Sequence, residues 1–150
     1  MPTEYGFSWK WAAPAIGLVG VTLLIGIVTY PGLPDRIPIH FGADGKADSY
    51  ADKNIWSSFG IVLVQVATLL VVFAASSTRL RRYANGPDFR TFGRSMLLFG
   101  AAAQLTLLLA ALVVWQLLPA GGWLLPVILA PTAGGVVYLL MQSRRHRIED

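Results

Sequence analysis

The stretch SMLLFGAAAQLTLLLAALVVWQLLPAGGWLLPVILAPTAGGVVYLLMQS, residues 95–143, contains no charged side chain. Two shorter charge-free runs precede it, from Trp11 to Pro34 and from Asn54 to Thr78. A helix needs about 20 apolar residues to span the hydrocarbon core of a bilayer. The long run is enough for two such helices. The sequence Leu-Pro-Ala-Gly-Gly at residues 118–122 favours a tight turn between them, because proline and glycine break helices.

We therefore predict an all-α membrane protein, a four-transmembrane-helix bundle with an ordered extracytoplasmic loop between the first two helices. The loop covers about residues 31–53. The predicted spans cover about residues 11–30, 55–78, 95–118 and 122–142.

The composition supports a single membrane domain over residues 1–150. Hydrophobic residues make up 55% of the chain and charged residues 13%, whereas a soluble domain carries about 25% charged residues. Four spans leave little chain for a soluble domain, so a water-soluble core is the weaker interpretation. The absence of cysteine from the sequence excludes disulfides and thiolate metal sites.

Basic residues are divided unevenly between the two sides of the predicted bundle. The two ends of the chain and the connector between the second and third spans carry nine of the twelve Lys and Arg residues. Short loops rich in Lys and Arg stay in the cytoplasm. We therefore predict a multi-pass plasma-membrane protein with both termini cytoplasmic. Five arginines of the inner connector are expected to contact lipid headgroups: Arg79, Arg81, Arg82, Arg90 and Arg94.

Aromatic residues collect near the predicted ends of the spans. Such residues form belts where membrane meets water, although tryptophan also packs between helices. The aromatic residues at the predicted boundaries are Trp9, Trp11, Tyr30, Trp56, Trp115 and Trp123.

The largest polar side chains inside the predicted spans are those of Gln65, Gln104 and Gln116. Glutamine in hydrocarbon usually forms hydrogen bonds between helices, and we expect that role for all three.

The first connector, LPDRIPIHFGADGKADSYADK at residues 33–53, carries most of the functional information. Three prolines between Pro31 and Pro38 hold the backbone extended and exclude helix. The apolar residues Ile37, Ile39 and Phe41 alternate with other residues, as on a half-buried extended segment. The Asp-Gly pair that follows predicts a turn. We expect an ordered loop, pressed against the ends of the first two spans.

Within this loop we expect Asp35, His40 and Asp48 to form one polar cluster. His40 and the nearby aspartates are also possible ligands for zinc or a harder cation. However, the loop contains only one histidine, and its aspartates lie in turn-like sequence, where they usually satisfy backbone amides. We expect no metal and no cofactor.

The loop resembles the signature of a bacterial domain of unknown function that forms the N-terminal part of the SdpI immunity proteins. The family pattern reads Leu-Pro-Asp-x-Ile-Pro-x-His-Phe, followed by a glycine, an aspartate, an aromatic residue and a lysine. Gly42 stands where the family often has asparagine, and residues 79–150 lack the Gly-Asn and Pro-Lys elements of the second half of SdpI proteins. The pattern is carried here by Leu33, Pro34, Asp35, Ile37, Pro38, His40, Phe41, Gly45, Asp48, Tyr50 and Lys53.

The resemblance implies a structural or recognition role for the loop. In the SdpI proteins it implies protection from a toxin outside the cell and capture of a repressor at the inner face. The candidate site residues are Leu33, Pro34, Asp35, Arg36, Pro38, His40, Phe41, Gly45, Asp48 and Tyr50.

Two function classes follow. The first is a non-enzymatic recognition, immunity or signalling module whose loop binds a peptide, lipid or protein at the outer face. The second is an accessory subunit of a transporter or cell-envelope complex. The chain has no Gly-x-Ser-x-Gly, His-Glu-x-x-His or phosphate-binding glycine loop, so we expect no enzyme. The positive-inside effect accounts for the inner arginines, so we expect no nucleic-acid partner.

Overall fold

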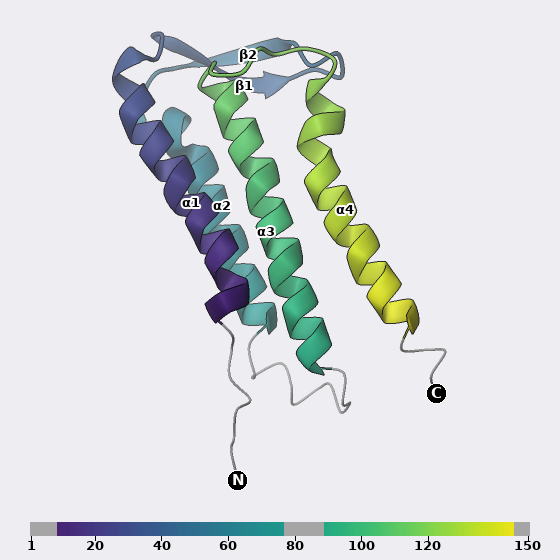
Figure 1. The fold of residues 1–150 in the computed structure, drawn as a ribbon. Coiled ribbons are helices and arrows are strands. Elements are labelled where there is room, and N and C mark those ends of the chain that lie inside the picture. The colour runs from purple at the N-terminus through teal and green to yellow at the C-terminus, as the bar shows by residue number, and fades with distance from the viewer. Residues whose placement is uncertain (1–8, 77–88, 146–150) are drawn as a thin grey trace.

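The computed structural model describes residues 9–76 and 89–145, and these form four helices with a small sheet across one end (Figure 1). The helices are α1 (Trp9–Thr29), α2 (Ile55–Ser76), α3 (Phe89–Val114) and α4 (Leu124–Arg145). Between α1 and α2 lie the 3-10 turn η1 (Tyr30–Gly32) and the strands β1 (Arg36–Phe41) and β2 (Ala47–Asp52). The mostly helical fold agrees with the prediction, and the two strands are an element that the all-α prediction did not include.

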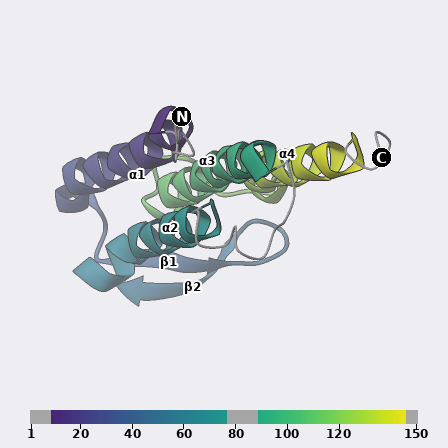
Figure 2. The same ribbon diagram turned by 90° about the horizontal axis from the view of Figure 1, so that it is seen from below.

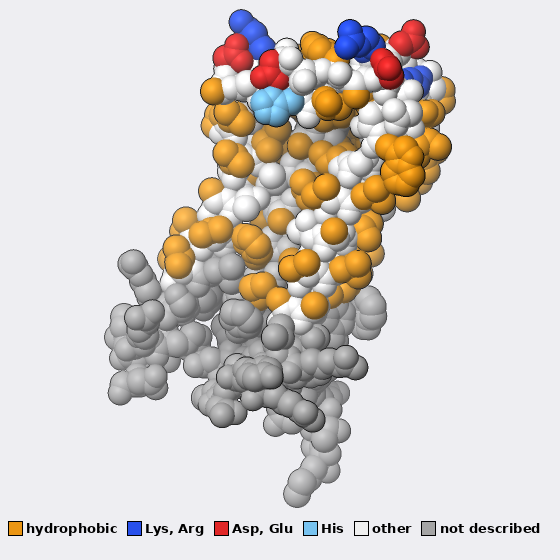
Figure 3. Space-filling view, turned by 180° about the vertical axis from the view of Figure 1, so that it is seen from behind, with side chains coloured by type: hydrophobic (Ala, Val, Ile, Leu, Met, Phe, Trp, Pro, Cys, Tyr) orange, Lys and Arg blue, Asp and Glu red, His pale blue; other side chains and the backbone are white. Residues whose placement is uncertain are grey.

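Three helices are long and apolar enough to cross a membrane, over Lys10–Gly32, Ile55–Ala75 and Ser95–Val114. The apolar part of α4, Leu124–Tyr138, is shorter. On the face that Figure 3 shows, apolar side chains cover the helical flanks, whereas charged side chains gather at the end that carries the sheet. A surface of this kind suits a hydrocarbon environment beside an aqueous one. The chain is therefore a multi-pass membrane protein.

Helix α3 is the centre of the bundle. It packs against α1, α2 and α4, while α1 also packs against α2. Figures 1 and 2 show α1, α3 and α4 in one layer with α2 on one face of that layer. Close packing near the sheet depends on Gly26 of α1, because a Cβ atom there would lie 2.8 Å from the rings of Phe59 and Trp115. Helix α4 lies at the edge of the layer and has α3 as its main neighbour.

Helix α3 differs most from its predicted span. It begins at Phe89 and ends at Val114, instead of covering about residues 95–118. The charge-free run marks only the segment suited to hydrocarbon, and α3 begins before that segment, with Arg90 and Arg94 in its first turns. At the other end, the amide of Leu117 donates to the carbonyl of Leu112 at 2.8 Å, and that of Gln116 donates to Val113 at 2.9 Å.

This pattern is a Schellman motif, in which the residue after the helix adopts a left-handed conformation. Gln116 takes that place with φ 58°, and its side chain is exposed. The prediction of an interhelical hydrogen-bonding role is therefore wrong for Gln116. The helix also ends before Pro119, so the connection to α4 runs over residues 115–123 and is longer than the predicted turn.

The other two glutamines join helices as predicted. Gln65 of α2 and Gln104 of α3 are fully buried, and Gln104 Nε2 donates to the carbonyl of Gln65 at 2.9 Å. Gln65 Nε2 donates to the hydroxyl of Thr22 in α1 at 3.0 Å. The hydroxyls of Thr106 and Thr132 lie 2.7 Å apart and link α3 to α4. Such bonds hold helices together where lipid offers no hydrophobic driving force.

Candidate functional site

The candidate site is a β-hairpin, residues 33–53, that lies across one end of the bundle (Figure 1). Its strands are antiparallel, with Arg36 opposite Asp52 and Pro38 opposite Tyr50. The register shifts between Pro38 and His40, which leaves Ile39 without a paired residue. A bulge of this kind is a usual place for proline, which has no N–H to donate to the ladder.

The bulge changes the predicted alternation of apolar residues. Ile37 is fully buried and Phe41 is half-buried, but Ile39 is 53% exposed. The prediction that all three share a half-buried face is therefore wrong for Ile39. The bulge turns this one large apolar side chain away from the helices.

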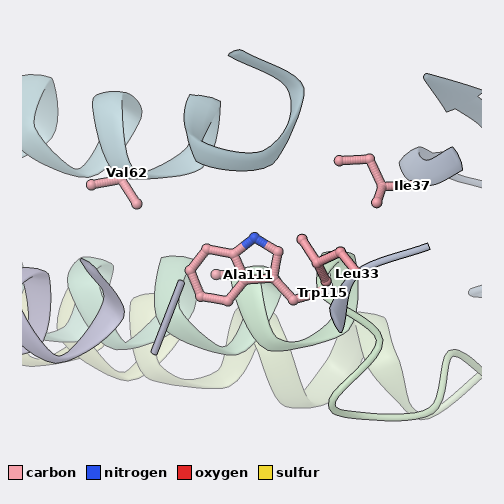
Figure 4. Packing of buried hydrophobic residues seen from close by; sticks show 5 residues of the cluster. All are labelled: Leu33, Ile37, Val62, Ala111 and Trp115. Atoms are coloured by element: carbon pink, nitrogen blue, oxygen red, sulfur yellow. The ribbon is translucent and has the colours of Figure 1, made fainter. Parts of the chain in front are cut away.

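Leu33 and Ile37 anchor the hairpin to the helices. They pack in one cluster with Val62 of α2 and with Ala111 and Trp115, at the end of α3 (Figure 4). Burying a side chain as large as isoleucine or leucine stabilises a fold by about 1.5–3 kcal/mol. The hairpin is therefore part of the same core as the helix ends.

Trp115 lies at the centre of this cluster and is 2% exposed. Its indole Nε1–H donates to the carbonyl of Ser58 at 2.8 Å, so the polar atom of the ring has its partner inside the protein. The prediction of a place in the interfacial aromatic belt is wrong for Trp115. Trp56, by comparison, is 77% exposed and suits that belt.

The tip of the hairpin is a tight turn at residues 42–45. The amide of Gly42 donates to the carbonyl of Lys46 at 2.9 Å, and the Asp44 carboxylate accepts from the Lys46 amide at 3.0 Å. Gly45 has φ 74°, a left-handed conformation that favours glycine. A Cβ atom at Gly45 would collide with the carbonyl of Gly121, in the α3–α4 connection. The tip therefore packs directly against a segment far away in sequence.

The base of the hairpin is closed by Lys53. Its backbone amide donates to the carbonyl of Asp35 at 2.7 Å. Its ammonium donates to the carbonyls of Leu33 at 2.9 Å and Pro31 at 3.3 Å, and lies 5.0 Å from the centre of the Tyr30 ring. A cation above an aromatic face is attracted by the electron density of the ring. Lys53 thereby ties the end of β2 to the turn that follows α1.

The polar cluster predicted from the sequence is reduced to a pair. His40 Nδ1 and Asp48 Oδ1 lie 2.6 Å apart, between the two strands, with side chains that are 68% and 53% exposed. Asp35 lies at the other end of β1, where its carbonyl bonds to Lys53, and it does not share this contact. Within the described residues, no group of three or more histidine and acidic side chains is placed to hold a metal ion.

The candidate residues thus divide into two sets. Leu33, Pro38 and Gly45 are buried and Phe41 is half-buried. The exposed members are Pro34, Asp35, Arg36, His40, Asp48 and Tyr50. The first set holds the hairpin on the helices, and the second set, with Ile39, is presented to the surroundings.

The predicted lipid-headgroup residues are only partly covered by the structure. Arg79, Arg81 and Arg82 lie outside the described residues. Arg90 and Arg94 belong to the first turns of α3, and their side chains lie outside the described part of the chain. Their contact with lipid stays a prediction.

Two contacts of the site escaped the sequence analysis. One is the approach of Gly45 to Gly121, which only the folded chain brings together. The other is the packing of Trp115 under the hairpin. The paired glycines at Gly121 and Gly122 were a signal for the first, because a segment without side chains allows close approach of another backbone.

Comparison with known proteins gives one match. Residues 17–66 match a family model described as "Domain of unknown function (DUF1648)". The matched segment is a third of the chain, and it runs from within α1 through the hairpin into α2. No curated protein and no solved structure matches the chain. The resemblance to this domain of unknown function is therefore confirmed for residues 17–66.

Proposed function

We propose that this chain is a non-enzymatic recognition module of a bacterial plasma membrane, which binds a peptide or protein through the exposed face of its hairpin. The observation that carries the proposal is the division of the hairpin into an anchored side and an exposed side. Ile37 and Leu33 fix it on the helices, while Ile39 and Tyr50 are 53% and 49% exposed. The hairpin holds a defined shape while it exposes apolar and charged groups. This favours binding, because a preformed surface loses less entropy on association.

The proposal includes a topology. Four spans with both termini in the cytoplasm place the hairpin outside the cell, in agreement with the excess of basic residues on the opposite side. In this arrangement the hairpin meets partners from the extracellular or periplasmic space. An immunity or signalling role would use that position.

The experiment uses the lack of cysteine in the chain. A single Tyr50→Cys variant in intact cells is treated with a membrane-impermeant, thiol-reactive photo-crosslinker. We expect labelling and, after illumination, one discrete adduct with a peptide or protein. The adduct should weaken when exposed Ile39 is also replaced by serine. A Val64→Cys variant on the exposed flank of α2, treated with a permeant reagent, is the control and should give no such adduct.

The outcomes separate the parts of the proposal. Failure to label Tyr50→Cys contradicts the outward orientation. Labelling without a discrete adduct contradicts the recognition role.

A second function, an accessory subunit of a transporter or envelope complex, is favoured by the position of α4. This helix packs mainly against α3, and Leu129 and Val137 are more than half exposed. In this second function, a partner helix in the membrane covers that side. A Val137→Cys variant with a permeant crosslinker tests it: a discrete adduct there, with none from Tyr50→Cys, would favour the accessory role.

A further inference from the structure

The centre of the helix bundle contains two buried polar atoms that have no hydrogen-bond partner among the described residues. Gln65 and Gln104 are both fully buried. Each side chain donates its amide N–H to the backbone carbonyl of the other residue, at 3.3 Å from Gln65 and 2.9 Å from Gln104. Both amide nitrogens therefore have partners. The two amide oxygens, Oε1 of Gln65 and Oε1 of Gln104, have none.

Rotating the amides does not resolve this. The nitrogens already face backbone carbonyls, which only accept hydrogen bonds, so exchanging nitrogen for oxygen would place two acceptors together. The nearby hydroxyl of Thr22 donates to the carbonyl of Leu18 at 2.8 Å and accepts from Gln65. Its single proton is already used. The missing donor is therefore not among the described residues 9–76 and 89–145.

The cost of leaving these oxygens unserved is large. A buried acceptor without a partner keeps the full penalty of losing its hydrogen bonds to water, and the hydrocarbon around a spanning helix supplies no water from its surface. Buried polar groups left over by the protein are typically served by internal water that makes two to four hydrogen bonds. The junction between α1, α2 and α3 is polar enough for such a molecule, since it includes the oxygens of Thr22, Gln65 and Gln104.

We propose that the Gln65–Gln104 junction is a binding site for internal water, which donates hydrogen bonds to the two amide oxygens. Water fits these groups, because each of the two amide oxygens needs one donated proton and a water molecule is a small donor that carries two. A divalent cation fits poorly, since it needs about six oxygen ligands. The sequence of the described helices also contains no aspartate or glutamate to balance its charge.

Water-edited solid-state NMR on the full chain in phosphatidylcholine bilayers tests the proposal. Magnetisation starts on water and is followed to nitrogen-bound protons. We expect the magnetisation to reach the side-chain amides of Gln65 and Gln104 about as fast as it reaches the exposed side-chain amide of Gln116. The buried backbone amides of Val72 and Ala111, which lie among apolar residues, should receive it many times more slowly. Transfer to both glutamines as slow as to Val72 and Ala111 would overturn the proposal.

A Thr22→Val variant excludes a different source of the signal. The threonine hydroxyl exchanges protons and lies 3.0 Å from Gln65 Nε2, so it could relay magnetisation itself. Valine has nearly the same shape and no hydroxyl. With internal water present, fast transfer to Gln104 persists in this variant. If the fast transfer disappears at both glutamines while the fold is kept, the hydroxyl was its source and the water site is rejected.

Discussion

The two sides of the hairpin make a direct comparison, because they are built from the same two short strands. The side facing the helices holds Ile37 at full burial, together with Leu33, over Trp115. The opposite side shows Ile39, Tyr50 and the His40–Asp48 pair to the surroundings. The inner side stabilises the fold through apolar contacts with the helices, whereas the outer side contributes little to stability.

This difference divides the signature residues of the loop into two groups, those needed for packing and those that are exposed. Some of these residues are explained by packing, since they fill the core or permit a backbone approach. Packing does not explain the exposed residues, such as Asp35, Arg36 and Tyr50. These exposed positions are where a binding function has to be sought.

The largest expected difference lies between two isoleucines of the same strand. Ile37→Ala should lower the free energy of unfolding by about 2–5 kcal/mol, because it removes a fully buried side chain and leaves a cavity over Trp115. Ile39→Ala, at the exposed bulge, should change it by no more than about 0.5 kcal/mol. Unfolding in mixed micelles, followed by tryptophan fluorescence, measures both variants. Equal losses would remove the distinction between the two sides.

An intermediate effect is expected at the tip. Gly45→Ala should cost about 1–2 kcal/mol for the left-handed backbone alone, and its Cβ atom would also push the tip away from Gly121. The backbone amides of residues 42–46 should then exchange faster with deuterium than in the wild type. Gly32→Ala is the control, since a Cβ atom there meets nothing within 4 Å. Unchanged exchange at the tip of Gly45→Ala would show that the contact with Gly121 does not hold the hairpin.

The smallest effect is expected for the His40–Asp48 pair on the exposed side. A double-mutant cycle with His40→Ala and Asp48→Ala should give a coupling energy of about 0–1 kcal/mol, because water competes for both side chains. The same variants should reduce formation of the Tyr50→Cys adduct if the exposed side binds a partner. A coupling energy well above this range would move the pair from the exposed group to the structural one.

The sequence predicted the helices well for a simple reason. Charge-free runs of this length have few uses outside hydrocarbon. Most of each of the four helices lies within such a run. The extended segment and the Asp44-Gly45 turn were also predicted correctly, since proline and glycine act locally. Strand β2 was missed because Ala47–Asp52 is rich in alanine and aspartate, which strands disfavour. Its pairing comes from the turn and from β1.

Residues near the ends of spans were the hardest to place. A tryptophan at such a boundary has the same sequence context whether it faces lipid or the core, and only the register of α3 against α2 decides the matter for Trp115. Gln116 was assigned to a span because no charge marks the end of α3. The actual signal is a left-handed residue, which composition does not reveal. The hydrogen-bonding role of Gln65 and Gln104 was predictable, but their choice of each other's backbone was not.

The contact between Gly45 and Gly121 has a consequence for how the chain is made. The hairpin lies between the first two helices, so it leaves the ribosome early, whereas the segment its tip rests on follows α3. Local bonds such as that from the Lys53 amide to Asp35 can form at once. The segment that the tip contacts, around Gly121, is present only after α3 and the connection that follows it have been synthesised and inserted. Completion of the hairpin is therefore a late step of biogenesis, and its surface reaches its final shape only in a chain that has finished assembling.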